Sequence, residues 1–334
     1  MAQIVQVFGT SHSPTLNSPA EEQLHHAKVD KGVSHWKREL LDWQGNPASY
    51  EKILAQADPA IAGQITPEII EERTERCQAD IQKLGAAIEA AELDTLVIIG
   101  DDQHEVFSDA NMPAILIYWG ETITNKVLTM SDDVPDWWRR ARSQYYEPEQ
   151  PRDYPVDNEL GLHLIEYLLD RDFDVSQSRE LSGDHGEGHA YGFFHRRLMT
   201  GPEDLPIVPV ALNTYYPPNQ PRPKRCFELG RKIREAVEDW EEDARVGVLA
   251  SGGLSHFTID EELDTGVLDA CANKDEDHLT SIPLNLLNSG NSEIRNWITA
   301  AGAAEHLELT WRDYVPCYRS EAGTGCGMAF AVWK

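Results

Sequence analysis

Short apolar runs that alternate with segments of helical periodicity constrain the fold of this chain more than any other feature. Each run is rich in β-branched and aliphatic residues and has the length of a buried strand. The runs occupy residues 4–8, 95–100, 114–118, 207–212 and 246–250, and two closing runs occupy residues 307–314 and 327–333. Helical patterns occupy residues 71–91, 158–169, 225–242, 274–287 and 292–304. Strands separated by helices predict an α/β fold, with a central, mostly parallel or mixed sheet flanked by helices.

Two long segments, residues 13–60 and 121–157, resist this pattern. They are rich in Pro, Trp, Asp and Glu and have no clear period. Long irregular stretches inside a compact domain are often functional loops, so we expect active-site loops here. No internal repeat or low-complexity linker divides the chain, and we expect a single domain over residues 1–334.

The charge of the chain limits its partners. It has 57 acidic and 29 basic residues and a formal net charge of −28. Such a surface repels nucleic acid and anionic membranes, so we expect neither as a partner. An aromatic acid would also be repelled at long range, and its carboxylate would need a local basic group. Arg222, Lys224 and Arg225 are candidates for that group.

Other features of the sequence favour a cytoplasmic protein. No run of about 18 apolar residues predicts a transmembrane helix. The first eight residues lack the basic start and long apolar core of a signal peptide. The five cysteines are scattered without a Cys-x-x-Cys pair, which makes a disulfide framework or a thiolate zinc site improbable.

Histidines follow three of the predicted strands. His12 follows the first strand, His104 follows the strand at residues 95–100, and His256 follows the strand at residues 246–250. In α/β sheets, ligands bind beyond the carboxyl ends of the strands. A single histidine in a turn is more often structural than functional. If the three strands are parallel neighbours, however, their imidazoles point into one crevice, where imidazole is a common metal ligand.

A fourth histidine cluster lies at residues 182–190, where three glycines surround His185 and His189. The glycines disfavour a zinc-binding helix. A flexible loop and a tight turn beside a ligand are equally compatible with the pattern. Since no cysteine clusters with the histidines, metal ligands would be nitrogen and oxygen. Two histidines and one carboxylate with open positions are typical of non-haem Fe(II) oxygenases. Local spacing cannot select the carboxylate, because 57 acidic residues are present.

These motifs resemble those of the class III extradiol ring-cleavage dioxygenases, the superfamily of the protocatechuate 4,5-dioxygenase beta subunit. The resemblance covers most of the chain and is carried by residues 9–14, 97–107, 206–213, 223–229, 251–256 and 289–297. The Gly-Asp-Asp-Gln-His-Glu and Gly-His-Ala-Tyr-Gly motifs are most similar to those of the 3-O-methylgallate dioxygenase branch.

The resemblance implies an enzyme that uses Fe(II) and O₂ to open a catechol-type ring beside a vicinal diol. It implies His12, His104 and Glu293 as iron ligands and His256 as the acid/base histidine. A second active-site histidine is implied at His189, with His185 left open.

The resemblance also leaves several alternatives open. An alignment shifted by one residue would place Gln103 or Glu105 nearer the metal than His104. Related enzymes imply a homodimer, and some have a small helical subunit or a fused equivalent, of which we expect no counterpart in this sequence because no extra domain of that kind is obvious. A zinc-dependent hydrolase and a non-catalytic binding protein remain alternatives, because histidines and a carboxylate also suit Zn²⁺.

Overall fold

The computed structural model describes residues 1–32, 38–181 and 183–334. Its main sheet has neighbouring parallel strands at its centre. Its strand order is β10-β11-β1-β8-β2-β7-β3-β6, with β9 paired to β11. The strands are β1 (Gln3–Thr10), β2 (Thr95–Asp101), β3 (Ile115–Tyr118), β6 (Ser176–Ser178), β7 (Ile207–Leu212), β8 (Arg245–Ser251), β9 (His256–Thr258), β10 (Leu309–Tyr318) and β11 (Thr324–Trp333). Strands β1, β8, β2 and β7 are parallel, whereas β11 and β3 run antiparallel to their central neighbours. The predicted mixed sheet is confirmed.

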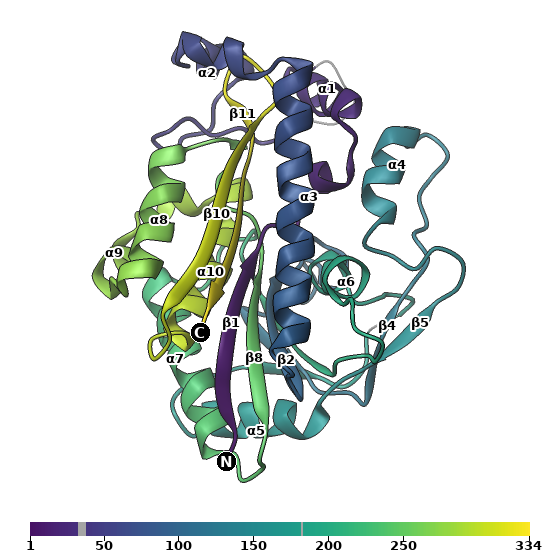
Figure 1. The fold of residues 1–334 in the computed structure, drawn as a ribbon, viewed down its shortest axis with the longest axis vertical. Helices are drawn as coiled ribbons and strands as arrows, with labels where there is room; N and C mark the ends of the chain where they lie inside the picture. Colours follow the sequence, from purple (N-terminus) through teal and green to yellow (C-terminus); the bar gives the residue numbers. More distant parts are fainter. Residues whose placement is uncertain (33–37, 182) are drawn as a thin grey trace.

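Helices cover both faces of this sheet, because its central strands are apolar on both sides. In β2, Val97 and Ile99 pack on one face, and Leu96 and Ile98 pack on the other. The first face is covered by α5 (Asn158–Leu169), α7 (Pro223–Asp239), α8 (Glu261–Asn273), α9 (Glu276–Ser281) and α10 (Ile294–Ala303). The second is covered by α3 (Pro67–Ala90), α6 (His189–Phe193) and the π-helical turn η3 (Phe194–Leu198). Figure 1 shows α3 in front of the sheet and α10 behind it.

The two irregular segments contain short elements. The first contains η1 (Pro14–Asn17), α1 (Ala20–Asp30), α2 (Tyr50–Leu54) and the start of η2 (Pro59–Gln64). Residues 33–37 of this segment and Ser182 of the histidine cluster lie outside the described residues. The second contains α4 (Asp136–Ser143) and the hairpin of β4 (Thr122–Asn125) and β5 (Arg152–Pro155). Figure 1 shows α4 and this hairpin beside α6.

The predicted helix at residues 274–287 is wrong in extent. The structure has α9 and a separate turn, η4 (Leu284–Leu287), with Pro283 between them. Proline disfavours the helical conformation of the residue before it, and Ile282 has an extended ψ of 125°. Helix α8 was not predicted, although Asp260 caps it by accepting a hydrogen bond from the Leu263 amide. Within the described residues, no helix is both long and apolar enough to cross a membrane.

Candidate active site

Glu293 is the residue around which the predicted site residues gather. It ends the short turn η5 (Ser289–Glu293) and directly precedes α10. Its Oε2 lies 3.3 Å from His12 Nε2, and its Oε1 lies 3.3 Å from His256 Nε2. His12 follows β1 and His256 begins β9 after β8, so the parallel pairing of β1 and β8 brings both imidazoles to one edge. The structure therefore brings together three residues that the sequence places far apart.

Close backbone packing holds Glu293 against His256. A Cβ atom at Gly290 would lie 2.1 Å from the His256 carbonyl oxygen, so only glycine allows η5 to approach this closely. At the other end of the site, a Cβ atom at Gly9 would lie 2.6 Å from the Trp297 ring. Trp297 donates a 2.8 Å hydrogen bond from Nε1 to the Gly252 carbonyl oxygen. These contacts fix α10 against the ends of β1 and β8.

Hydrogen bonds and charge keep Glu293 ionised. Its carboxylate accepts hydrogen bonds from the Gly253 amide at 2.6 Å and from Gln103 Nε2 at 3.2 Å. Burial alone would raise the pKa of Glu293, but the positive charge of His256, with that of His12 whenever its ring is protonated, holds that pKa well below its usual range. Burial would likewise lower the pKa of His256, while Glu293 raises it to about 9.

The hydrogen bonds of His12 fix which of its ring nitrogens is free. Ser251 Oγ donates its proton to the Ala190 carbonyl oxygen at 2.7 Å, so it accepts from His12 Nδ1 at 3.0 Å. The Nε2 atom of neutral His12 is therefore unprotonated. It is buried and has no hydrogen-bond partner among the described residues. An imidazole lone pair that faces a carboxylate in this way is suited to a metal ion.

His189 reaches the same place from the start of α6. Its ring lies edge-on to that of His12, with centroids 4.5 Å apart. Its Nδ1 lies 2.5 Å from Glu105 Oε2, and Arg142 and Tyr146 donate to the other oxygen of Glu105. Burial would raise the pKa of Glu105, but His189 and Arg142 hold it well below its usual range. Glu105 therefore accepts the Nδ1 proton and leaves the Nε2 edge of His189 available, as in many metal sites.

Asp101, the last residue of β2, is a second carboxylate beside His12. Its Oδ1 lies 3.8 Å from His12 Nε2, and ligand atoms of His12, Asp101 and His189 all lie within 4.8 Å of one another. Asp101 Oδ2 is buried without a hydrogen-bond partner among the described residues. Burial and the charge of Glu293 raise the pKa of Asp101 well above its usual range. The nitrogen and oxygen donors of this group fit a divalent cation.

The structure does not bring His104 into this group. His104 has a positive φ of 60°, and its ring stacks on Tyr216 at a centroid distance of 3.8 Å. Its side chain is 40% exposed, and its Nε2 lies 3.7 Å from Asp109. The adjacent Gln103 contacts Glu293 instead. The metal-ligand role that the resemblance implies for His104 therefore stays a prediction.

The two histidines of the cluster at residues 182–190 also separate. His189 is 2% exposed and lines the cavity of the site, whereas His185 is exposed and lines a different surface hollow. The proposed basic candidates lie elsewhere too: Lys224 pairs with Glu228, and Arg225 donates to the Asp172 carbonyl oxygen. None of Arg222, Lys224 and Arg225 lines the cavity.

The candidate active-site cavity has a volume of about 340 Å³. Residues of the first irregular segment, Thr15, His26, Val29 and Arg38, form part of its wall. It also contains three guanidinium groups, those of Arg38, Arg142 and Arg319. The sequence analysis missed Asp101 and Arg142. A polar residue at the end of a buried strand was a usable signal for Asp101, whereas nothing local distinguishes Arg142.

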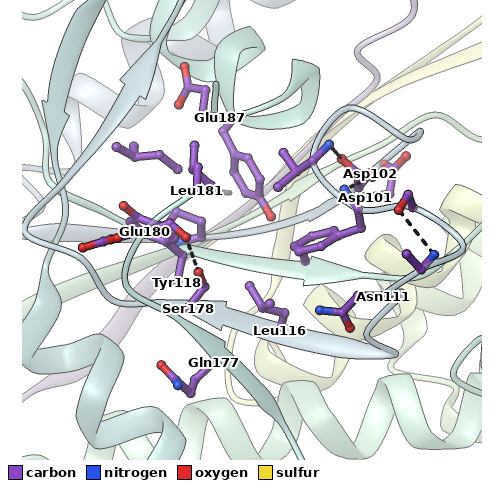
Figure 2. A pocket seen from close by; sticks show the side chains of 18 residues that line it. Asp101, Asp102, Asn111, Leu116, Tyr118, Gln177, Ser178, Glu180, Leu181 and Glu187 are labelled. Carbon is purple, nitrogen blue, oxygen red and sulfur yellow. Dashed lines mark hydrogen bonds between the residues drawn. The ribbon is translucent and has the colours of Figure 1, made fainter. Parts of the chain in front are cut away.

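A second cavity, of about 390 Å³, is lined by Asp101 and Asp102. Figure 2 shows Asp101 and Asp102 on one side of it, opposite Tyr118, Glu180 and Leu181. Among the described residues that line it, none is arginine, lysine or histidine. The charged side chains that line it are thus acidic, whereas the candidate active-site cavity is also lined by arginines and histidines.

Comparison with known families matches residues 59–322 to the catalytic LigB subunit of aromatic ring-opening dioxygenase. The match spans more than half of the chain, and the protein belongs to this family. The matched range includes Glu105, His189, His256 and Glu293 and begins after His12.

Individual relatives are similar over about half of their own length. The chain is 31% identical over 174 residues to gallate dioxygenase of Pseudomonas putida, covering 47% of this chain and 49% of that protein. It is 29% identical over 171 residues to 2,3-dihydroxyphenylpropionate/2,3-dihydroxicinnamic acid 1,2-dioxygenase of Comamonas testosteroni, covering 51% and 46% respectively. A protein of the same name from Xanthobacter autotrophicus is 27% identical over 191 residues, covering 57% and 51%.

Proposed function

We propose that this protein is a non-haem Fe(II)-dependent extradiol dioxygenase. It would incorporate both atoms of O₂ into a catechol-type aromatic acid beside its vicinal diol. Membership of the ring-opening dioxygenase family supports the reaction class. The observation that carries the proposal is the buried Nε2 of His12, which has no hydrogen-bond partner among the described residues and faces the carboxylate of Glu293.

His12, His189 and Glu293 would hold the iron. This set keeps two residues implied by the resemblance and replaces His104 with His189, whose ring lies close to that of His12 and whose Nδ1 is held by Glu105. Glu293 is preferred to Asp101 because it is ionised and lines the same cavity as the two histidines. When bound, Fe(II) lowers the pKa of the substrate diol and provides the site for O₂ activation.

His256 would move the substrate proton. Its Nδ1 donates to the Leu254 carbonyl oxygen at 2.8 Å, which fixes the ring orientation. Its Nε2 then faces the cavity next to Glu293 and lies 3.4 Å from Tyr215 Oη. A metal cation bound by Glu293 would offset the negative charge that raises the pKa of His256. Neutral His256 could then accept the diol proton and return it during ring opening, a contribution of about 10²–10⁴-fold in rate.

The substrate is proposed to be 3-O-methylgallate, gallate or a protocatechuate-like acid. The motif resemblance favours the 3-O-methylgallate branch. The relatives named above are named for gallate and for dihydroxyphenyl acids, which are also aromatic diols with a carboxylate.

Oxygen consumption tests this function. The protein, reconstituted anaerobically with Fe(II), is mixed with 3-O-methylgallate, gallate, protocatechuate or catechol in an oxygen electrode, and the products are identified by mass spectrometry. We expect one O₂ consumed per ring opened and no turnover without O₂. Turnover under anaerobic conditions with Zn²⁺ would instead indicate a hydrolase.

A further inference from the structure

Two arginines in the wall of the candidate active-site cavity share a single carboxylate. Arg319, which follows β10, donates to Asp30 from Nε at 2.6 Å and from Nη2 at 3.1 Å. Arg38 donates to the same Asp30 from Nη1 at 2.7 Å. Asp30 is the last residue of α1 and is fully buried at its side chain. Two cations therefore surround one anion.

This cluster, Arg38–Asp30–Arg319, retains a positive charge. Within the described part of the chain, every ion pair of the two arginines is with Asp30. The sequence of residues 33–37, Val-Ser-His-Trp-Lys, contains no carboxylate. The adjacent His26 adds no charge, because burial, Arg319 and Arg38 lower its pKa well below its usual value. Among the described residues, one guanidinium charge of the cluster is thus left without a carboxylate partner.

The surroundings make that charge available to a ligand in the cavity. The side chains of Arg38 and Arg319 are only 13% and 2% exposed, and both line the cavity with His12, His256 and Glu293. A buried charge without a partner is unfavourable, and an anion that enters the cavity offsets this cost. The third arginine differs, because Arg142 pairs one-to-one with Glu105.

We infer that the Arg38–Arg319 pair binds the carboxylate of the aromatic substrate. The inference rests on the proposed function, because it places the diol of the same molecule toward His12 and Glu293. It also explains how a chain with a net charge of −28 can accept an anionic substrate. Arg38 is the specificity-determining residue of the pair. Arg319 is held by both oxygens of Asp30, whereas Arg38 bonds only one of them. The other hydrogen bonds of Arg38 to described residues are with the neutral His26, at its carbonyl oxygen (3.2 Å) and its Nδ1 (3.1 Å), and do not balance the guanidinium charge.

A pair of substrates that differ only in charge tests this inference. The Fe(II)-loaded wild type, Arg38→Met and Arg142→Met are assayed with protocatechuate and with 3,4-dihydroxybenzamide. Arg38→Met should lower kcat/KM for the acid by about 10- to 100-fold, as expected for the loss of one charge-assisted contact, and change that for the amide little. Arg142→Met is the matched control. It should lower both values together, because Arg142 acts through Glu105 on His189.

Equal losses for the acid and the amide in Arg38→Met would overturn the inference, as would a selective loss of the acid in Arg142→Met alone. If Arg38→Met does not fold, Arg38→Lys should keep a weaker preference for the acid. An acid-to-amide ratio equal to that of the wild type would then contradict the assigned role of the guanidinium.

A binding measurement separates this inference from the proposed reaction. Calorimetry on the anaerobic Fe(II)-loaded protein compares 4-hydroxybenzoate with 4-hydroxybenzamide, neither of which has a vicinal diol. We expect tighter binding of the benzoate, and loss of that preference in Arg38→Met. If the wild type opens neither ring, the proposed function fails, whereas the preference for the carboxylate still decides this inference. Equal binding of the two compounds by the wild type would refute it.

Discussion

Two cavities of similar size lie near Asp101, which lines the second of them, yet only the candidate active-site cavity has the side chains of a catalytic site. The candidate active-site cavity contains His12, His256 and Glu293, and the second cavity has an acidic lining. Each has a histidine–glutamate pair at its border: His189 with Glu105 in the first, and His195 with Glu187 in the second.

The difference between these pairs lies in what the imidazole faces. The ring of His189 meets that of His12, whereas the ring of His195 stacks on Tyr154 at a centroid distance of 3.8 Å. A carboxylate that orients a histidine is therefore insufficient for a metal site. Further nitrogen and oxygen donors must converge on the same point.

The largest expected effect comes from removing Glu293, the carboxylate that contacts both His12 and His256 in the proposed metal centre. Loss of a group that merely orients a ligand lowers metal affinity by about 10–100-fold. Glu293→Ala removes a proposed ligand itself, so it should lower iron affinity by more than about 100-fold and abolish ring opening. Asp101→Asn should retain iron, because Asp101 lines the second cavity and not the candidate active-site cavity, and because burial and the charge of Glu293 raise its pKa. Iron content after anaerobic desalting measures both. Iron lost from Asp101→Asn and kept by Glu293→Ala would assign the carboxylate ligand to Asp101.

The next comparison concerns the second imidazole ligand. His189→Ala should also lower iron affinity by about 100-fold or more, because the variant removes a proposed ligand. His104→Ala should keep iron and activity and change the free energy of unfolding by about 0.5 kcal/mol or less, since its ring is partly exposed. Metal titration and urea denaturation of both variants check this. Loss of iron in His104→Ala would restore the ligand set implied by the sequence resemblance.

The resemblance implies His104 beside Glu293, but in the structure Gln103 contacts Glu293 instead. This difference shows where sequence reasoning reaches its limit. The strands were predictable because apolar runs of this length are buried in parallel sheets, and their order brought His12 and His256 together as expected. The positive φ of His104, however, turns that ring toward Tyr216. A change in one backbone dihedral leaves no trace in the hydrophobic pattern.

Contacts between distant segments were also beyond the sequence. Arg38 and Arg319 meet at Asp30 only because α1 packs beside the end of the β10–β11 hairpin. Arg142 reaches Glu105 from α4, within a segment that has no periodic pattern. Such pairings depend on tertiary packing, which local spacing does not encode.

A smaller effect is expected from the glutamates that orient the two histidines. Glu105→Gln removes the charge that orients His189, so iron affinity should fall by about 10–100-fold. The matched variant Glu187→Gln alters the corresponding pair beside the second cavity and should leave iron affinity unchanged. Competition with a chromogenic Fe(II) chelator measures both affinities. Equal losses in the two variants would mean that the second pair also belongs to the metal centre.

The smallest effect concerns the second cavity itself. Tyr191 lines it, and the Tyr191 hydroxyl is buried without a hydrogen-bond partner among the described residues. A buried hydroxyl that lacks a partner contributes no net hydrogen-bond stability, so Tyr191→Phe should leave the free energy of unfolding unchanged or raise it by up to about 1 kcal/mol. Tyr118→Phe is the control, because the Tyr118 hydroxyl donates a 2.8 Å hydrogen bond to the Thr122 carbonyl oxygen and its loss should destabilise by about 1 kcal/mol. Urea denaturation of the three proteins gives the comparison. A loss in Tyr191→Phe as large as that in Tyr118→Phe would mean that the Tyr191 hydroxyl has a hydrogen-bond partner, such as a polar molecule bound in the second cavity. The second cavity would then also have to be treated as a binding site.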